Sequence, residues 1–116
     1  MVKGQLEDEI TKAMIQWERD YMGRGPDEAK TDILRNMIIV TLRGVLSKAE
    51  QHLARDKDGA ALVKKLRQQL VEQGRQEIEM IVNKITSAKV ISLHTDISTK
   101  TGERVFILVI DKNLYN

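Results

Sequence analysis

Two short stretches of this chain are apolar at every position, and both have the length and composition of β-strands. They run from Met37 to Val40 and from Val105 to Ile110, and both are rich in β-branched side chains. A strand with one face in water alternates apolar and polar residues, whereas an unbroken apolar run is typical of a strand covered on both faces. We therefore expect both strands to lie inside a sheet, with helices over one face and a further layer over the other. That further layer is either the N-terminal helix or a second copy of the protein.

The first third of the sequence predicts a helix followed by a β-hairpin. The helix has an apolar face made by residues three or four positions apart, namely Leu6, Ile10, Met14, Trp17 and Tyr21. Gly23 is expected to end it, because glycine adopts the left-handed conformation of a helix C-terminus at little cost. Residues 27–36 are compatible with a short helix that begins at Pro26. A hairpin that turns near Arg35 and Asn36 is favoured, because asparagine tolerates positive φ and a β-branched run follows it.

The rest of the sequence predicts two helices and then two strands. Ser47 and Glu50 have the spacing of a capping box, which predicts a helix from Ser47 to about Arg55. Asp58 is the expected N-cap of a longer helix from Gly59 to Lys84. Gly74 lies in the middle of that helix and predicts either a kink or a close contact between helices. The last two strands are expected to flank a turn at residues 99–102.

These elements define the expected fold class, which is α+β. The predicted order is helix, two strands, two helices, two strands, and the predicted sheet has four mostly antiparallel strands covered by helices. A chain of 116 residues fits one compact domain, so we assign residues 1–116 to a single domain. The strand order cannot be derived from the sequence.

Composition excludes several classes of function. Nineteen Lys and Arg face seventeen Asp and Glu, with the signs interleaved, and only four residues are aromatic, so no nucleic-acid partner is expected. The chain has no cysteine, which fits a reducing compartment. The apolar run Val105–Ile110 is far shorter than the roughly 20 residues of a membrane-spanning helix, and Met1–Glu9 lacks the apolar core of a signal peptide. We expect a cytoplasmic protein without direct membrane insertion.

The corner "GRGP" at residues 23–26 has two interpretations. Consecutive backbone amides together with Arg24 can form an anion-binding nest for phosphate or carboxylate. Glycine is also the usual residue at a helix end, and the stretch lacks the lysine and serine or threonine that follow a phosphate loop. We favour a structural corner and keep Arg24 as a candidate ligand or partner contact.

The second candidate surface is the predicted hairpin near the C-terminus. His94 and Asp96 are two residues apart in a strand, so their side chains point to the same face. Together with Thr99, Lys100 and Arg104 they form a possible ligand or partner surface. A metal site would need at least one further ligand, and no spacing supplies one. A polar hairpin tip explains the loop residues, but it does not explain His94 and Asp96 within the strand.

The long helix carries four basic residues, Lys64, Lys65, Arg67 and Arg75, that could contact an acidic partner or lipid head groups. A solvated helix face with scattered ion pairs is the ordinary explanation. No nucleophile, metal set or cofactor loop is recognisable, so we expect no enzymatic activity and no cofactor.

Three stretches carry a family resemblance: "GRGP", "MIIVTLRGVLSKAE" and "HTDISTKTGERVFILVID". Together they resemble the bacterial MpsC-like family, which is associated with a sodium-translocating, membrane-potential-generating system. Lys48 and Asn36 depart from the family pattern, which has proline and an acidic residue or glycine there. The resemblance implies a small protein that works beside membrane components for ion or inorganic-carbon transport, and it implies no catalytic residues.

Two functions therefore stand as hypotheses. The first is a non-enzymatic accessory or regulatory subunit that binds membrane transport proteins. The alternative is a small-anion or nucleotide sensor that uses the GRGP corner and the hairpin residues. In either case we expect a homodimer, because the apolar strands and the long helix need more cover than one short chain provides.

Overall fold

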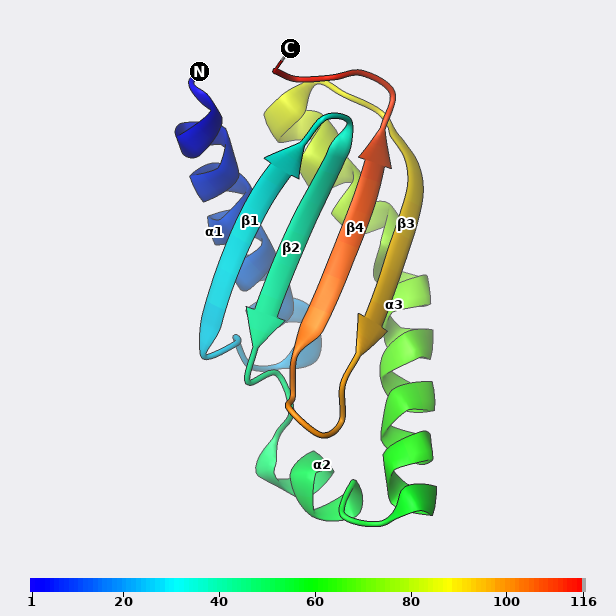
Figure 1. Ribbon diagram of the computed structural model, residues 1–116. Coiled ribbons are helices and arrows are strands. Elements are labelled where there is room, and N and C mark those ends of the chain that lie inside the picture. The colour runs from blue at the N-terminus through cyan, green and yellow to red at the C-terminus, as the bar shows by residue number, and fades with distance from the viewer. Residues whose placement is uncertain (116) are drawn as a thin grey trace.

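The computed structural model describes residues 1–115 as one four-stranded sheet with three helices (Figure 1). In chain order the elements are α1 (Lys3–Met22), β1 (Glu28–Leu34), β2 (Met37–Arg43), α2 (Lys48–Leu53), α3 (Lys57–Thr86), β3 (Val90–Ile97) and β4 (Arg104–Ile110). This order confirms the predicted α+β class and the hairpin at residues 27–43.

The sheet is antiparallel throughout and its strand order is β1-β2-β4-β3. The two apolar strands β2 and β4 are therefore neighbours in the middle, as expected for strands apolar at every position. Ile39 lies opposite Ile107 across the central pair, and Asp32 and His94 extend the same row to the two edges. This row thus contains one residue from every strand.

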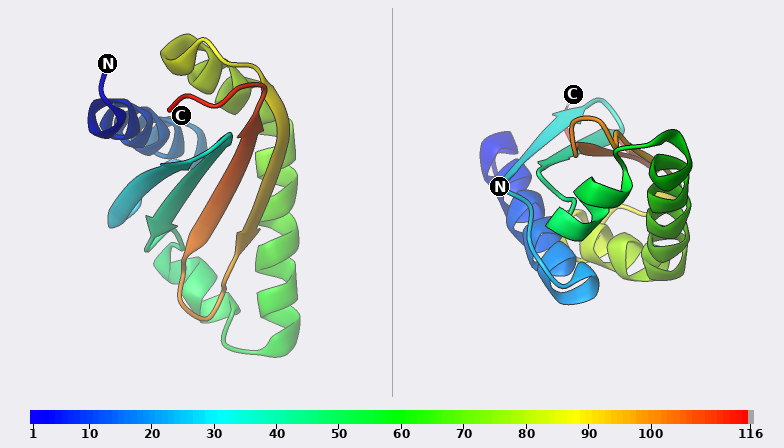
Figure 2. Two further views of the ribbon diagram at one scale, coloured as in Figure 1. Left: turned by 45° about the horizontal axis from the view of Figure 1, so that its top comes forward. Right: turned by 90° about the horizontal axis from the view of Figure 1, so that it is seen from below.

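Both long helices lie on the same face of the sheet (Figures 1 and 2). The side chains of the central strands that point to that face are fully buried, and they include Ile38, Val40, Leu42, Phe106 and Leu108. The alternate residues of β2 and β4 are only partly buried, and no described helix among residues 1–115 lies over them. Of the two expected candidates for the further layer, α1 is therefore excluded, because α1 packs beside α3 on the covered face. We call the uncovered side the open face.

Helix α3 has 30 residues and crosses α1 near Gly74. A Cβ atom placed on Gly74 would lie 2.8 Å from Cζ2 of Trp17 and 3.1 Å from Cζ of Tyr21. The rings of Trp17 and Tyr21 are stacked with centroids 4.9 Å apart. Glycine at this position allows the two helices to approach, as the close-contact alternative predicts, and α3 also changes direction along its length (Figures 1 and 2).

Local details of the turns differ from expectation at two positions. In the first hairpin the positive φ, 56°, is at Arg35, the first residue of the two-residue turn, and not at Asn36. The N-cap of α3 is Asp56 and not Asp58, since the Asp56 carboxylate accepts the Gly59 amide at 2.7 Å. Gly102 has the positive φ predicted for the second hairpin, and the Ser47–Glu50 capping box forms as predicted.

Within residues 1–115, no helix combines the length and the apolar character that crossing a membrane requires.

Candidate functional site

The β3–β4 hairpin forms a shallow pocket of about 450 Å³ that contains three of the six predicted site residues. Asp96, Thr99 and Lys100 line it together with Lys64 from α3. The Lys64 Nζ atom lies 3.2 Å from Oδ1 of Asp96. A hydrogen bond from the Ile97 amide, and then the Lys64 ammonium, lower the pKa of Asp96. With Glu103, which also lines it, the pocket combines two anionic and two cationic side chains at an exposed hairpin tip.

The structure does not bring His94 or Arg104 into this pocket. His94 lies on the open face, on the same side as Asp96 as predicted, and its Nε2 is 3.1 Å from the Ser92 hydroxyl. Arg104 points to the helix-covered face, where it is 1% exposed and donates to the Thr95 hydroxyl at 2.8 Å. Arg104 also lies 5.5 Å from the centroid of the Phe106 ring. A ligand in the hairpin pocket would not touch it.

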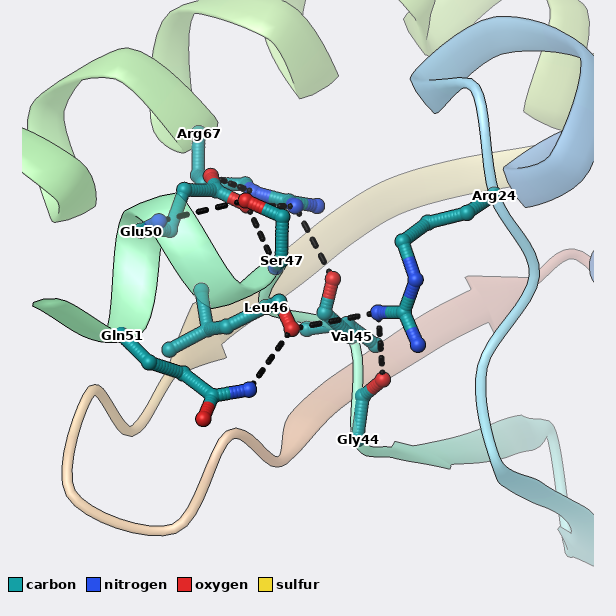
Figure 3. Close-up of polar contacts among 8 residues, drawn as sticks. All are labelled: Arg24, Gly44, Val45, Leu46, Ser47, Glu50, Gln51 and Arg67. Atoms are coloured by element: carbon teal, nitrogen blue, oxygen red, sulfur yellow. Dashed lines mark hydrogen bonds and ion pairs between the residues drawn. The ribbon is translucent and has the colours of Figure 1, made fainter.

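Arg24 belongs to a different site, at the beginning of α2 (Figure 3). Its Nη1 donates to the carbonyl oxygens of Gly44 at 2.8 Å and Leu46 at 3.2 Å. These bonds tie the corner after α1 to the segment that leads from β2 into α2. The arrangement supports the structural interpretation of the GRGP corner.

Arg67 binds the carbonyl oxygen of Val45, which lies between Gly44 and Leu46 in the segment from β2 to α2 (Figure 3). Its Nη2 donates to the Val45 carbonyl at 2.9 Å, and its guanidinium binds both carboxylate oxygens of Glu50, at 2.8 and 2.6 Å. Because Glu50 also closes the capping box with the Ser47 amide, one carboxylate joins α2 to α3. Hydrogen bonds from Arg67 chiefly, with help from Ser47, lower the pKa of Glu50 to about 2.

The burial of Arg67 corrects the prediction for the basic residues of α3. Lys64 and Lys65 are exposed as expected for a solvated face, whereas Arg67 is 4% exposed. The burial of Arg67 could have been predicted from its spacing. It lies four residues after Val63 and four before Val71, both of which are buried. An arginine in the apolar stripe of a helix is expected to be buried with a partner.

Glu18 is a buried acid that sequence reasoning missed. It lies four residues after Met14 in the buried stripe of α1 and is 1% exposed. Neither carboxylate oxygen has a hydrogen-bond partner among the described residues. Burial raises the pKa of Glu18, while the nearby guanidinium groups of Arg67, Arg104 and Arg24 oppose that shift. Glu18, Glu50, Arg67 and Arg104, with the partly exposed Arg24 beside them, therefore form a charged cluster that links α1, α2, α3 and β4.

The open face of the sheet is apolar in the middle and polar at both edges. Its centre is formed by the outward side chains of β2 and β4, which are Met37, Ile39, Thr41, Val105, Ile107 and Val109. Lys30 and Asp32 of β1 form one edge, and His94 and Asp96 of β3 form the other. An apolar centre with a polar rim is the usual composition of a protein–protein interface.

A second apolar surface lies on the opposite side of the molecule, between α1 and the C-terminal half of α3. It is an open groove of about 1200 Å³ whose apolar lining includes Trp17, Tyr21, Met80 and Ile81. Met80 is 70% exposed, and the Trp17 indole N–H donates to Glu77 at 3.1 Å. Large exposed apolar surfaces of this kind mark sites of interaction.

Within residues 1–115, no three His, Cys, Asp or Glu side chains gather in a way that could hold a metal ion.

Comparison with known proteins shows which family the chain belongs to. Residues 2–112 match the family described as "Na+-translocating membrane potential-generating system (MpsC)". The chain is similar to the uncharacterized protein YbcI of Bacillus subtilis (strain 168), with 48% identity over 112 residues, 97% of this chain and 90% of the relative. It is also similar to the uncharacterized protein YrhF of the same organism, with 30% identity over 108 residues, 91% of this chain and 88% of the relative. No solved structure matches.

Proposed function

The chain belongs to the MpsC family, and we propose that it is a non-enzymatic accessory or regulatory subunit that binds other components of a membrane transport system. The description of the family supports a role beside Na⁺ translocation and membrane energisation. The protein would act from the cytoplasm, at the membrane surface, through contacts with partner proteins. Transport of another ion or of inorganic carbon by those partners is compatible with the same role.

The observation that carries this proposal is the groove between α1 and α3. It is concave and mostly apolar, and an aromatic pair, Trp17 and Tyr21, forms one wall. A groove between two helices can receive the apolar face of an amphipathic helix from a partner. Asp20 and Glu79 at its rim, together with Lys84 and Lys89, suit a helix whose polar face carries both signs of charge. We assign to it a juxtamembrane helix of a transport component.

The test compares two exposed apolar residues of α3. Met80→Glu places a carboxylate in the groove, and Leu62→Glu places one on the same helix outside it, at a residue that is 58% exposed. After crosslinking in native cells and purification from membranes, transport subunits should accompany the wild type and Leu62→Glu, and their recovery should fall at least tenfold with Met80→Glu. Recovery of self-assemblies alone from the wild type would contradict the proposal.

The alternative function, sensing of a small anion or nucleotide, would depend on the hairpin pocket alone. Lys64 and Lys100 supply cationic groups there, but Asp96 and Glu103 supply as many carboxylates. Arg24 and Arg104 are engaged elsewhere by backbone and hydroxyl groups. A thermal-shift screen with phosphate, nucleotides and bicarbonate tests this function. Stabilisation that disappears in Lys100→Ala would favour it over the accessory role.

A homodimer completes the proposal, because the open face provides an apolar surface distinct from the partner groove.

A further inference from the structure

We propose that two copies of the chain pack through their open faces, sheet against sheet, around a two-fold axis that runs parallel to the strands. This inference rests on the proposed homodimer and adds its geometry and its contacts. It assigns β1 of one copy to a position over β3 of the other, and β2 to a position over β4. The occupant of the open face is thus a second copy of this chain.

The composition of the central strands indicates that the open face is covered. An antiparallel sheet with one solvated face normally carries polar residues on that face. Here the outward residues of β4 are Val105, Ile107 and Val109, and Ile39 and Met37 lie opposite the last two on β2. Polar side chains at these outward positions would not destabilise the inner core, because they would point away from it. Retention of a continuous apolar stripe on the outward side therefore indicates a covered surface.

The order of charges in the rows across the sheet fits a two-fold axis parallel to the strands. One row reads Lys30, Thr41, Val105, Asp96 from β1 to β3. Its ends carry opposite charges, and the side chains of Lys30 and Asp96 are 76% and 80% exposed. A two-fold axis parallel to the strands reverses each row and lays it over itself. Lys30 of each copy then faces Asp96 of the other, with apolar side chains between the two pairs.

The next row obeys the same rule. It reads Asp32, Ile39, Ile107, His94, so the reversed copy places the Asp32 carboxylate opposite the His94 imidazole. A two-fold axis across the strands through this row would instead place Asp32 opposite its own copy and His94 opposite its own copy. Like charges in direct opposition are destabilising, so the row order disfavours an axis across the strands through this row and is compatible with the axis parallel to the strands.

The face is at the small end of the size range of specific dimer interfaces. Four strands spaced about 4.8 Å apart and seven residues that each rise about 3.4 Å give a face of roughly 19 by 24 Å. The footprint is therefore roughly 460 Å² per copy, or roughly 920 Å² for the pair, which is close to the roughly 1,000 Å² in total that a specific interface needs. Two such sheets would pack about 10 Å apart with strands inclined by about 30°.

Cysteine crosslinking tests the geometry directly, because the chain contains no cysteine of its own. We would mix Lys30→Cys protein with Asp96→Cys protein and add a short bismaleimide. The axis parallel to the strands predicts crosslinked heterodimers in the mixture and little product from either variant alone, because the two copies of residue 30 lie at opposite edges. Efficient crosslinking of Lys30→Cys with itself, or no heterodimer, would overturn the arrangement.

Charge reversal provides an independent measurement. Lys30→Glu should raise the dimer Kd about fivefold or more, since it places a carboxylate opposite Asp96, and Asp96→Lys should do the same. The double variant should restore most of the affinity. Lys48→Glu is the matched control, because it makes the same charge change at an exposed position of α2 away from the open face. Equal effects of Lys30→Glu and Lys48→Glu would overturn the pairing.

The outcomes separate this inference from the function proposed above. A dimer that fails both tests contradicts only the sheet-to-sheet arrangement. A wild-type monomer contradicts the arrangement and the homodimer together. Neither result changes the recovery of membrane subunits through the groove, which Met80→Glu tests on its own.

Discussion

The two faces of the central strands have the same apolar character but opposite surroundings. On the inner face, Phe106 and Leu108 are fully buried under the protein's own helices. On the open face, Ile107 and Val109 alternate with them along β4 and are only partly buried. The difference shows that one chain has enough helix to cover one side of its sheet. The apolar composition of the second, uncovered side is the basis of the proposed dimer.

The largest expected effect comes from comparing adjacent residues of β4 on the two faces. Phe106→Ala should lower the free energy of unfolding by about 3–5 kcal/mol, because it leaves a cavity beneath Trp17, whose ring is 6.5 Å from that of Phe106. Ile107→Ala should cost under about 1 kcal/mol in dilute protein and more at high concentration, where the dimer contributes to stability. Urea unfolding at two protein concentrations measures both. Equal, concentration-independent losses would break the distinction between the faces.

Substitutions of a buried and of an exposed basic residue of α3 should also differ in their effect on the free energy of unfolding. Arg67→Ala should cost about 3 kcal/mol, since it removes the partner of Glu50 and the donor to the Val45 carbonyl from a buried position. Lys64 lies on the same helix and forms an exposed ion pair with Asp96 of β3, so Lys64→Ala should cost under about 1 kcal/mol. Denaturant titration of both variants provides the measurement. A mild Arg67→Ala phenotype would show that the cluster does not hold α2 against α3.

A change in the packing of α1 against α3 should have a smaller effect on the free energy of unfolding. Gly74→Ala gains about 1 kcal/mol of helix propensity but forces the new methyl group against Trp17. Overpacking of this kind costs about 1–3 kcal/mol, so we expect a net loss of about 1 kcal/mol and a shifted tryptophan fluorescence maximum. Thermal unfolding and fluorescence together test this. A stabilised variant with an unchanged spectrum would mean that the two helices have room to separate.

Two glutamates of the interior should give the smallest and most selective effect, a change in how stability depends on pH. Burial raises the pKa of Glu18 above its ordinary value of 4.5, so the folded state retains a proton that the unfolded state releases, and stability falls as pH rises from 4.5 through the raised pKa. Glu18→Gln should remove that decline. The pKa of Glu50 is lowered to about 2, so its contribution is complete above 4.5 and is lost as pH falls from 4.5 towards 2.

Urea unfolding between about pH 3 and pH 8 separates the two windows. Glu18→Gln should change the slope only above pH 4.5, and Glu50→Gln should change it only below. If Glu18→Gln leaves the upper slope unchanged, the Glu18 carboxyl is not perturbed by its burial.

Much of the fold could be predicted because local patterns determine it. The apolar spacing of α1, the Ser47–Glu50 capping box and the run Val105–Ile110 each specify an element without reference to the rest of the chain. Predictions failed where one residue competes with an equivalent neighbour. Asp56 and Asp58 are both suitable N-caps, and Arg35 and Asn36 share one turn, so the choice depends on surrounding geometry that the sequence does not show.

The candidate sites were harder to predict because they depend on which elements meet. The parity of His94 and Asp96 was visible in the sequence, but their relation to Lys30 and Asp32 requires the strand order. Arg67 and Glu18 occupy apolar stripes, so their burial was detectable, whereas their common cluster requires the packing of α1 against α3. Arg24 and Arg104 were both identified, but the fold directs them to separate partners.

The most direct test of the account is the mass of the wild-type protein in solution. Size-exclusion chromatography with light scattering at micromolar concentration should give twice the chain mass of 13.2 kDa, and Ile107→Glu on the open face should give a folded species of 13.2 kDa. A wild-type protein that elutes as a 13.2 kDa monomer would contradict the claim that the open face is covered by a second copy.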